Sequence, residues 1–166
     1  MLELVSEDPD DTPPPIGPVL QATHSLGVET TGPGFIPITE DLGLWLRRIR
    51  ARDGLLTVFI AHTSASLVIQ ENADPAAHAD LMRALDGFAP EHGGYSHADE
   101  GPDDMPAHIK AMLTSVSLSI PVVGGRAALG VWQGVYVVEH RAAPHRRKVS
   151  LHFIGCCDPQ SETVGP

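Results

Sequence analysis

The predicted fold depends most on residues 114–141, which read TSVSLSIPVVGGRAALGVWQGVYVVEHR. Two predicted strands, 114–122 and 128–141, flank the dipeptide Gly124-Gly125, a strong signal for a β-hairpin. Residues 135–138 are apolar on both faces, which indicates two packed sheets or a subunit interface. A further strand is predicted over 147–154. Successive strands without an intervening helix are typical of antiparallel pairing in an α+β domain.

Upstream of this stretch, strands and helices are predicted by apolar periodicity and by helix caps. These elements are strands 19–26 and 29–38, a helix capped by Thr39, strands 55–61 and 64–70, a helix over 74–88 and a short helix from Met105. Gly54 is expected to stop the first helix, and Gly134 is a candidate break in the strand 128–141. We write the order as ββαββαβββ, an α+β fold with mostly antiparallel strands.

Composition divides the chain into three parts. Residues 1–18 are acidic and proline-rich and are predicted to be a disordered arm, 19–157 a single domain, and 158–166 a flexible tail. Seven of the 21 acidic residues lie in the arm and tail, so 14 remain against 11 basic residues, and the net charge of −10 overstates the charge of the domain.

Several classes of protein are not supported by this composition. No apolar run approaches the roughly 20 residues that span a bilayer. The acidic N-terminus does not resemble a secretory signal, so a cytoplasmic protein without a membrane partner is expected. There is no broad basic stripe, which argues against a nucleic-acid partner. The basic residues late in the chain are enough for a local anion site.

The segment His97–His108, HADEGPDDMPAH, is the densest group of candidate ligands, with two imidazoles and four carboxylates in twelve residues. If a helix begins at Asp103 or Asp104, Asp104 and His108 lie one turn apart on the same face. Imidazole and carboxylate together are ligands of zinc and related divalent metals, or a base with its orienting acid. An exposed acidic loop with two incidental histidines is the alternative.

Further candidates follow two strands. His62 ends an apolar strand and precedes two hydroxyl residues. Glu139 and Arg141 share one face of a strand, and an acid at the end of an apolar strand needs a partner. Glu139 is therefore either half of an intramolecular Glu–Arg or Glu–His pair, or a metal ligand or general base, with Arg141 binding phosphate. Arg147 belongs to a basic turn that is either solvated or an anion site.

The ordered motifs of the chain resemble those of the YjbQ-like family, often labelled secondary thiamine-phosphate synthase. They are HTSASL (62–67), QENADP (70–75), YSH (95–97), DDMPAHIK (103–110), SLSIP (117–121), LGVWQGVY (129–136), EHR (139–141) and RRK (146–148). The resemblance spans about residues 20–155. Gln70 and Val131 depart from the usual family residues.

The resemblance implies a two-sheet β-sandwich with flanking helices that assembles as a homotrimer. It also implies an enzyme that joins a hydroxymethylpyrimidine diphosphate to a thiazole phosphate and releases pyrophosphate. A non-catalytic metal- or metabolite-binding trimer and a metal-dependent phosphohydrolase are the alternatives. The expected ligand is a small phosphorylated metabolite or inorganic anion, together with a divalent metal, Zn or Mg.

These considerations give one predicted site. The expected catalytic residues are His62, His97, Asp104, His108 and Glu139. Of these, the three histidines are the expected metal ligands. Arg141 and Arg147 are expected to bind the anion.

Overall fold

The computed structural model describes residues 18–158, which form eight strands and three helices. In chain order these are β1 (Leu20–Thr30), β2 (Gly34–Pro37), α1 (Thr39–Arg48), β3 (Ala51–Ile60), β4 (Ala65–Glu71), α2 (Pro75–Phe88), α3 (Asp104–Leu113), β5 (Ser117–Val123), β6 (Arg126–Ala127), β7 (Gln133–Glu139) and β8 (His145–Cys157). The predicted arm and tail lie outside the described residues, except for Pro18 and Asp158. Within the described part of the chain, no helix has the length and apolar character needed to cross a membrane.

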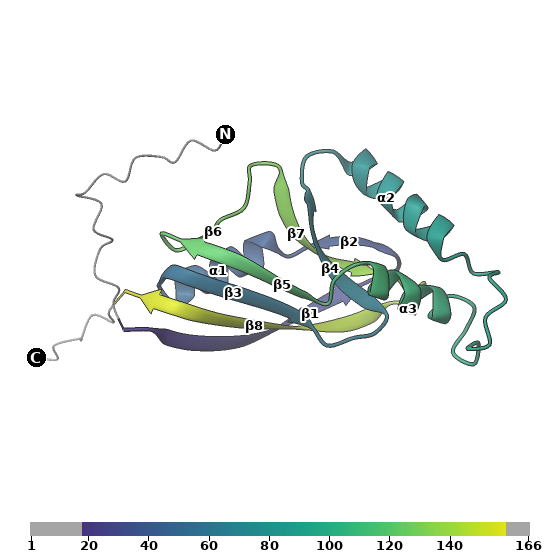
Figure 1. Cartoon of the computed structure of the whole chain (residues 1–166), viewed down its shortest axis with the longest axis horizontal. Helices are drawn as coiled ribbons and strands as arrows, with labels where there is room; N and C mark the ends of the chain where they lie inside the picture. Colours follow the sequence, from purple (N-terminus) through teal and green to yellow (C-terminus); the bar gives the residue numbers. More distant parts are fainter. Residues whose placement is uncertain (1–17, 159–166) are drawn as a thin grey trace, which may run out of the picture.

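The strands form two sheets in which every pairing is antiparallel (Figure 1). The larger sheet has the order β1-β8-β3-β5-β6, and the smaller has the order β2-β7-β4. The predicted α+β fold with mostly antiparallel strands in two sheets is thus confirmed. Figure 1 shows α1 at the end of the large sheet near the chain termini, and α2 and α3 toward the other end.

One hydrophobic core joins the two sheets and α1. Along β3, Leu56, Val58 and Ile60 are buried while Leu55 and Phe59 on the opposite face are exposed. This alternation follows from the two-residue period of a strand. The same core contains buried residues of β4, β7 and α1, and each fully buried Leu, Val or Ile contributes about 1.5–3 kcal/mol.

The end of α1 differs from the prediction. The helix ends at Arg48, and Arg50 adopts a left-handed backbone conformation with φ of 55°. Gly54 therefore does not stop the helix but lies inside β3. Its role is close packing, because a Cβ at Gly54 would lie 2.4 Å from the carbonyl oxygen of Ile154 on β8.

The hairpin predicted at Gly124-Gly125 is confirmed, since both glycines have positive φ, 56° and 79°, and connect β5 to β6. The strand predicted over 128–141 is shorter and begins at Gln133. Gly134 lies within β7 and does not break it. A separate two-residue strand, β6, pairs with β5 before the chain leaves the large sheet.

The two later helices begin where their caps predict. Asp74 caps α2, its Oδ1 accepting a hydrogen bond of 2.8 Å from the amide of Ala76. Asp103 occupies the cap position of α3, but its side chain makes no capping hydrogen bond. α3 packs against β4, which places its first turn beside the ends of the strands that carry the other candidate residues.

Candidate metal centre

Three of the predicted site residues, His97, Asp104 and His108, lie together at the start of α3. Their ligand atoms all lie within 4.8 Å of one another. Oδ2 of Asp104 is 2.9 Å from Nε2 of His97 and 3.4 Å from Nε2 of His108. Within residues 18–158 this is the one such group of three or more residues. We call it the His-Asp-His cluster.

The local sequence explains how the cluster forms. Asp104 is the first residue of α3, so His108 follows one turn later on the same face. Ala107 between them is fully buried and fixes which face of the helix turns inward. The loop before α3 brings His97 back toward that face, with its ring centroid 5.5 Å from that of His108.

A backbone carbonyl determines the tautomer of His108. Nδ1 of His108 lies 3.0 Å from the carbonyl oxygen of Thr63, and a carbonyl only accepts, so Nδ1 carries the hydrogen. In the neutral ring, Nε2 then presents a lone pair to the carboxylate of Asp104. Two acceptors facing each other need a proton or a cation between them. Metal-binding histidines are commonly held in this way by a second hydrogen bond.

Arg141 holds the acidic side of the cluster. Its Nη1 contacts Oδ1 of Asp104, its Nε lies 3.0 Å from Oδ2 of Asp103, and its Nη2 lies 2.8 Å from the carbonyl oxygen of Glu100. This leaves Oδ2 of Asp104, on a side chain only 3% exposed, directed at the two imidazoles. Apart from those imidazoles, this buried oxygen has no hydrogen-bond partner among residues 18–158.

Asp103 is kept ionised by its neighbours. Burial raises the pKa of Asp103, but hydrogen bonds from the amide of Ala142 and from Arg141 outweigh it, so the pKa lies below its ordinary value. Asp103 therefore helps to anchor Arg141 and does not point into the cluster.

The chemistry of the cluster fits a divalent transition metal. Two imidazole nitrogens and one carboxylate oxygen suit zinc and its first-row neighbours better than magnesium, which prefers oxygen ligands. The side chains of His97 and His108 are 50% and 32% exposed, so one side of the cluster faces solvent. Three protein ligands with an open side are characteristic of catalytic rather than structural zinc sites.

His62 lies near the cluster but outside it. Its Nε2 accepts a hydrogen bond of 2.9 Å from the backbone amide of Lys148, so that lone pair is occupied. Burial and the charge of Arg147 lower the pKa of His62, which keeps the ring neutral near pH 7. The next residue, Thr63, supplies the carbonyl that orients His108, so this loop contributes to the cluster through its backbone.

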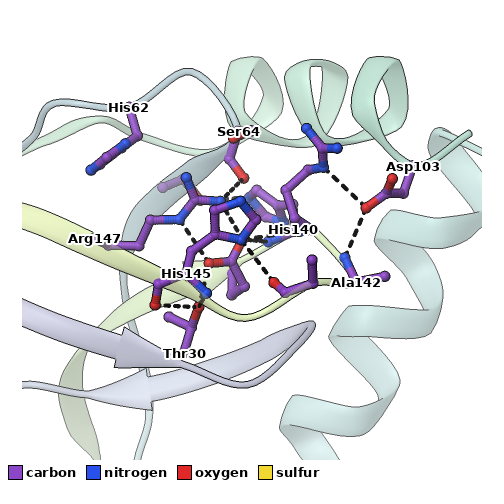
Figure 2. A network of polar contacts seen from close by, with 12 residues as sticks. Thr30, His62, Ser64, Asp103, His140, Ala142, His145 and Arg147 are labelled. Atoms are coloured by element: carbon purple, nitrogen blue, oxygen red, sulfur yellow. Dashed lines mark hydrogen bonds and ion pairs between the residues drawn. The ribbon is translucent and has the colours of Figure 1, made fainter. Parts of the chain in front are cut away.

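Glu139 also lies outside the cluster and is fully buried. It belongs to a polar network with Thr30, His140 and Arg147, which are labelled in Figure 2. Its carboxylate accepts hydrogen bonds of 2.7 Å and 2.6 Å from Nε and Nη2 of Arg147, and one of 2.7 Å from the hydroxyl of Thr30. The amides of His140 and Arg141 donate to the same carboxylate at 3.0 Å and 2.9 Å. This is the intramolecular Glu–Arg pair that the sequence left open, with Arg147 as the partner.

Three of the predicted site residues, Glu139, Arg141 and Arg147, are paired with other residues of the chain. Burial raises the pKa of Glu139, but the hydrogen bonds from Arg147, Arg141 and Thr30 outweigh it and lower the pKa below its ordinary value. Arg147 is paired with Glu139, and Arg141 with Asp103 and Asp104. For either arginine to bind phosphate, these ion pairs would have to open.

Sequence reasoning missed a buried polar group beside Glu139. His140 is 2% exposed, and its Nε2 lies 2.9 Å from the hydroxyl of fully buried Ser66. Burial and the charge of Lys110 lower the pKa of His140 to about 4. Lys110 is itself buried, with Nζ 2.5 Å from Oδ1 of Asp86. The sequence signal that could have indicated this burial is the position of His140 directly after a buried strand.

Comparisons with known proteins agree with this fold. A family model described as UPF0047 protein YjbQ-like matches residues 24–156. The chain is 54% identical over 136 residues to a UPF0047 protein of Synechocystis, covering 81% of this chain and 92% of that protein. It is 47% identical over 117 residues to the UPF0047 protein YjbQ of Salmonella typhimurium, covering 70% and 85%.

Solved structures show the same similarity. The crystal structure of a hypothetical protein from Aeropyrum pernix matches with a TM-score of 0.76 and 29% identity, covering 81% of this chain and 99% of that chain. A conserved hypothetical protein from Thermus thermophilus matches with a TM-score of 0.69 and 34% identity, covering 77% and 97%.

Proposed function

The chain belongs to the YjbQ-like UPF0047 family, and from its His-Asp-His cluster we propose that it is a metal-dependent enzyme that acts on a phosphorylated small molecule. The observation that carries this proposal is the placement of Oδ2 of Asp104. This buried oxygen faces Nε2 of both His97 and His108, while Arg141 neutralises the other oxygen of the same carboxylate. We expect the cluster to bind zinc or another first-row transition metal.

The residues of the chain have separate tasks in this proposal. A bound divalent cation would act as a Lewis acid that neutralises charge on a phosphoryl or pyrophosphate group. Arg141 fixes the ligand carboxylate, and the carbonyl of Thr63 fixes the ring of His108. Because Arg141 and Arg147 are paired within the chain, we expect substrate charge to be balanced mainly at the cluster.

Thiamine-phosphate synthesis is the first reaction to test, because the sequence resembles proteins that bear this label. In that reaction the bond between the pyrimidine methylene carbon and pyrophosphate breaks, and that carbon joins the thiazole ring nitrogen. The half-exposed side chain of His97 supports an open catalytic site over a closed binding site. A phosphohydrolase would use the same cluster with water as the nucleophile.

Metal analysis tests the proposal directly. Full-length protein purified without a metal-chelating tag should contain about one zinc or related ion per chain. Asp104→Asn should abolish this content, whereas Asp99→Asn, an exposed acid of the same loop, should retain it. Absence of metal from the wild type, or equal metal in Asp104→Asn, would contradict the proposal.

Activity separates the candidate reactions. The wild type should release pyrophosphate from the pyrimidine diphosphate only when thiazole phosphate is present, if it is a synthase. Release of phosphate from simple phosphomonoesters would favour the phosphohydrolase. Metal binding with neither reaction would favour a non-catalytic binding protein and would contradict the enzyme proposal.

We also propose that the protein forms a homotrimer, as the family resemblance implies. The outer face of the large sheet supports self-association, because Leu55, Phe59 and Ile154 are 39%, 43% and 44% exposed there. Leu55 and Ile154 are directly paired across β3 and β8, and Phe59 lies on the same face of β3 beyond the pair of Thr57 and His152. Exposed apolar patches of this kind commonly mark protein interfaces.

A trimer would place part of the site at a subunit boundary. A shallow hollow of about 460 Å³ is lined by Phe59, His62, Ser64 and Val116, among others, and therefore adjoins both the apolar face and the loop that orients His108. A neighbouring copy seated on Phe59 would cover this hollow. A cytoplasmic location remains a prediction.

A further inference from the structure

A second hollow, rich in arginine, lies at the other end of the large sheet. It has a volume of about 640 Å³ and is bounded by α1, the start of β3, the β5–β6 hairpin and the start of β7. Four arginines line it, namely Arg47, Arg50, Arg52 and Arg126. We call this hollow the arginine groove.

The groove is distant from the His-Asp-His cluster. Asp158, directly after β8, lines the groove, whereas the amide of Lys148 near the start of β8 contacts His62. Ten residues of strand separate Lys148 from Asp158, which corresponds to about 33 Å. The two ends of the large sheet are separated accordingly in Figure 1.

One face of α1 forms a wall of the groove. Thr39, Gly43 and Arg47 follow one another at four-residue intervals and all line the groove. A glycine inside a helix costs about 1 kcal/mol relative to alanine. A Cβ at Gly43 would lie 3.4 Å from Nη1 of Arg47, an ordinary contact distance, so the guanidinium group lies directly beside the helix at Gly43.

The charges in the groove are unbalanced. Four guanidinium groups line it, and among residues 18–158 the only carboxylate that lines it is that of Asp158, 3.7 Å from Arg52. This pair is weak, because the side chains of Arg52 and Asp158 are 55% and 54% exposed. Arg47 and Arg126 have no ion-pair partner among residues 18–158. Arg47 and Arg126 therefore bring two positive charges that no carboxylate of the described residues balances.

From these observations we propose that the arginine groove is a second ligand site, which binds a phosphorylated small-molecule anion. Guanidinium groups bind phosphate oxygens in a bidentate manner, and several of them around one hollow fix both charge and orientation. The volume lies in the range of small-molecule sites and exceeds what inorganic phosphate alone requires. The groove involves none of the residues of the His-Asp-His cluster.

Titration with inorganic pyrophosphate tests the proposal. Isothermal calorimetry on the full-length protein, with EDTA present to exclude metal-bound pyrophosphate, should give a Kd below about 1 mM. Arg47→Glu and Arg126→Glu should each weaken binding at least tenfold. The matched control is Arg48→Glu, which makes the same charge change in the last turn of α1 but does not line the groove, and it should change the affinity less than twofold.

Two further measurements locate the binding. Pyrophosphate should bind Asp104→Asn protein as tightly as the wild type, and it should shift the amide resonances of Gly43, Gly124 and Gly125. Circular dichroism and melting temperatures should show that the arginine variants remain folded. Wild-type affinity in both groove variants, equal loss in Arg48→Glu, or loss of binding in Asp104→Asn would each overturn the proposal.

Discussion

Asp104 and His108 are one helical turn apart on α3, and Oδ2 of Asp104 lies 3.4 Å from Nε2 of His108. Since Nδ1 of His108 donates to the carbonyl of Thr63, the neutral ring presents a lone pair to a buried carboxylate oxygen. Two acceptors that face each other in this way repel, whereas a cation bound between them is stabilised by both. The predictions for the cluster follow from this pair.

Replacement of His108 should remove metal selectively. His108→Ala deletes a ligand nitrogen, so the affinity for zinc should fall by a factor of about 100 or more, because even loss of a hydrogen-bond partner behind a ligand commonly costs roughly 10- to 100-fold. The melting temperature of EDTA-treated protein should change little. His92→Ala, a change in an exposed histidine of the preceding loop, should leave zinc affinity unchanged. Competition with a chromophoric chelator measures the zinc affinity of both variants. Normal zinc binding by His108→Ala would remove this residue from the site.

Zinc should stabilise the folded protein. A ligand at 100 times its Kd that binds only the folded state adds about 2.7 kcal/mol. For a chain of this size this corresponds to a rise in melting temperature of about 5–10 °C. Calorimetric scans of EDTA-treated protein with and without added zinc measure the effect, and Asp104→Asn should show none. An equal rise in that variant would indicate binding elsewhere.

The buried pair of Glu139 and Arg147 should matter for stability. Arg147→Met leaves the fully buried carboxylate of Glu139 without its main partner, and such losses cost about 3–5 kcal/mol. Arg146→Met is the matched control, because its side chain is 77% exposed and it pairs with exposed Glu29. Urea unfolding should show a loss below about 1 kcal/mol for this control. Similar losses in both variants would show that the buried pair is not important.

His140 should make stability depend on pH. Burial lowers its pKa from 6.5 to about 4, so between these values the unfolded chain binds a proton that the folded chain excludes. The stabilisation is fully present above pH 6.5 and is lost as pH falls toward 4, by about 3 kcal/mol in total. The free energy of unfolding, measured with urea in the presence of EDTA, should be lower at about pH 4.5 than at about pH 7 by most of this amount.

Proton NMR provides the direct check on His140. Its ring resonances should titrate near pH 4, well below the ordinary range for histidine. Titration of His140 above about pH 6 would show that its ring is not excluded from water as the structure indicates.

Self-association should depend on the outer face of the large sheet. One chain has a mass of 17.7 kDa, so a trimer has three times this mass, about 53 kDa. Phe59→Glu places a charge in the apolar face and should shift light scattering at micromolar concentration toward the monomer mass. Phe88→Glu, the same change at the exposed end of α2, should not. A wild type that scatters only as 17.7 kDa would contradict the trimer.

The sequence by itself determined the parts of this protein that depend on local physical rules. The hairpin at Gly124-Gly125 was predictable because glycine readily takes positive φ. The start of α2 followed from the Asp74 cap, and the shared face of Asp104 and His108 followed from helix periodicity. Most of β3 was predicted as the strand 55–61, and the absence of regular helix–strand alternation identified the α+β class.

Only the tertiary structure decided which partners meet across the chain. The sequence left open whether Glu139 pairs with an arginine or a histidine, and the fold assigns Arg147 to it and Arg141 to Asp103 and Asp104. His62 was an equally good ligand by residue type, yet its Nε2 is occupied by the amide of Lys148. The physical reason is that a charged or imidazole side chain can obtain the hydrogen bond or opposite charge that it needs from many different partners. Sheet register and helix packing, which no local pattern specifies, select one of them.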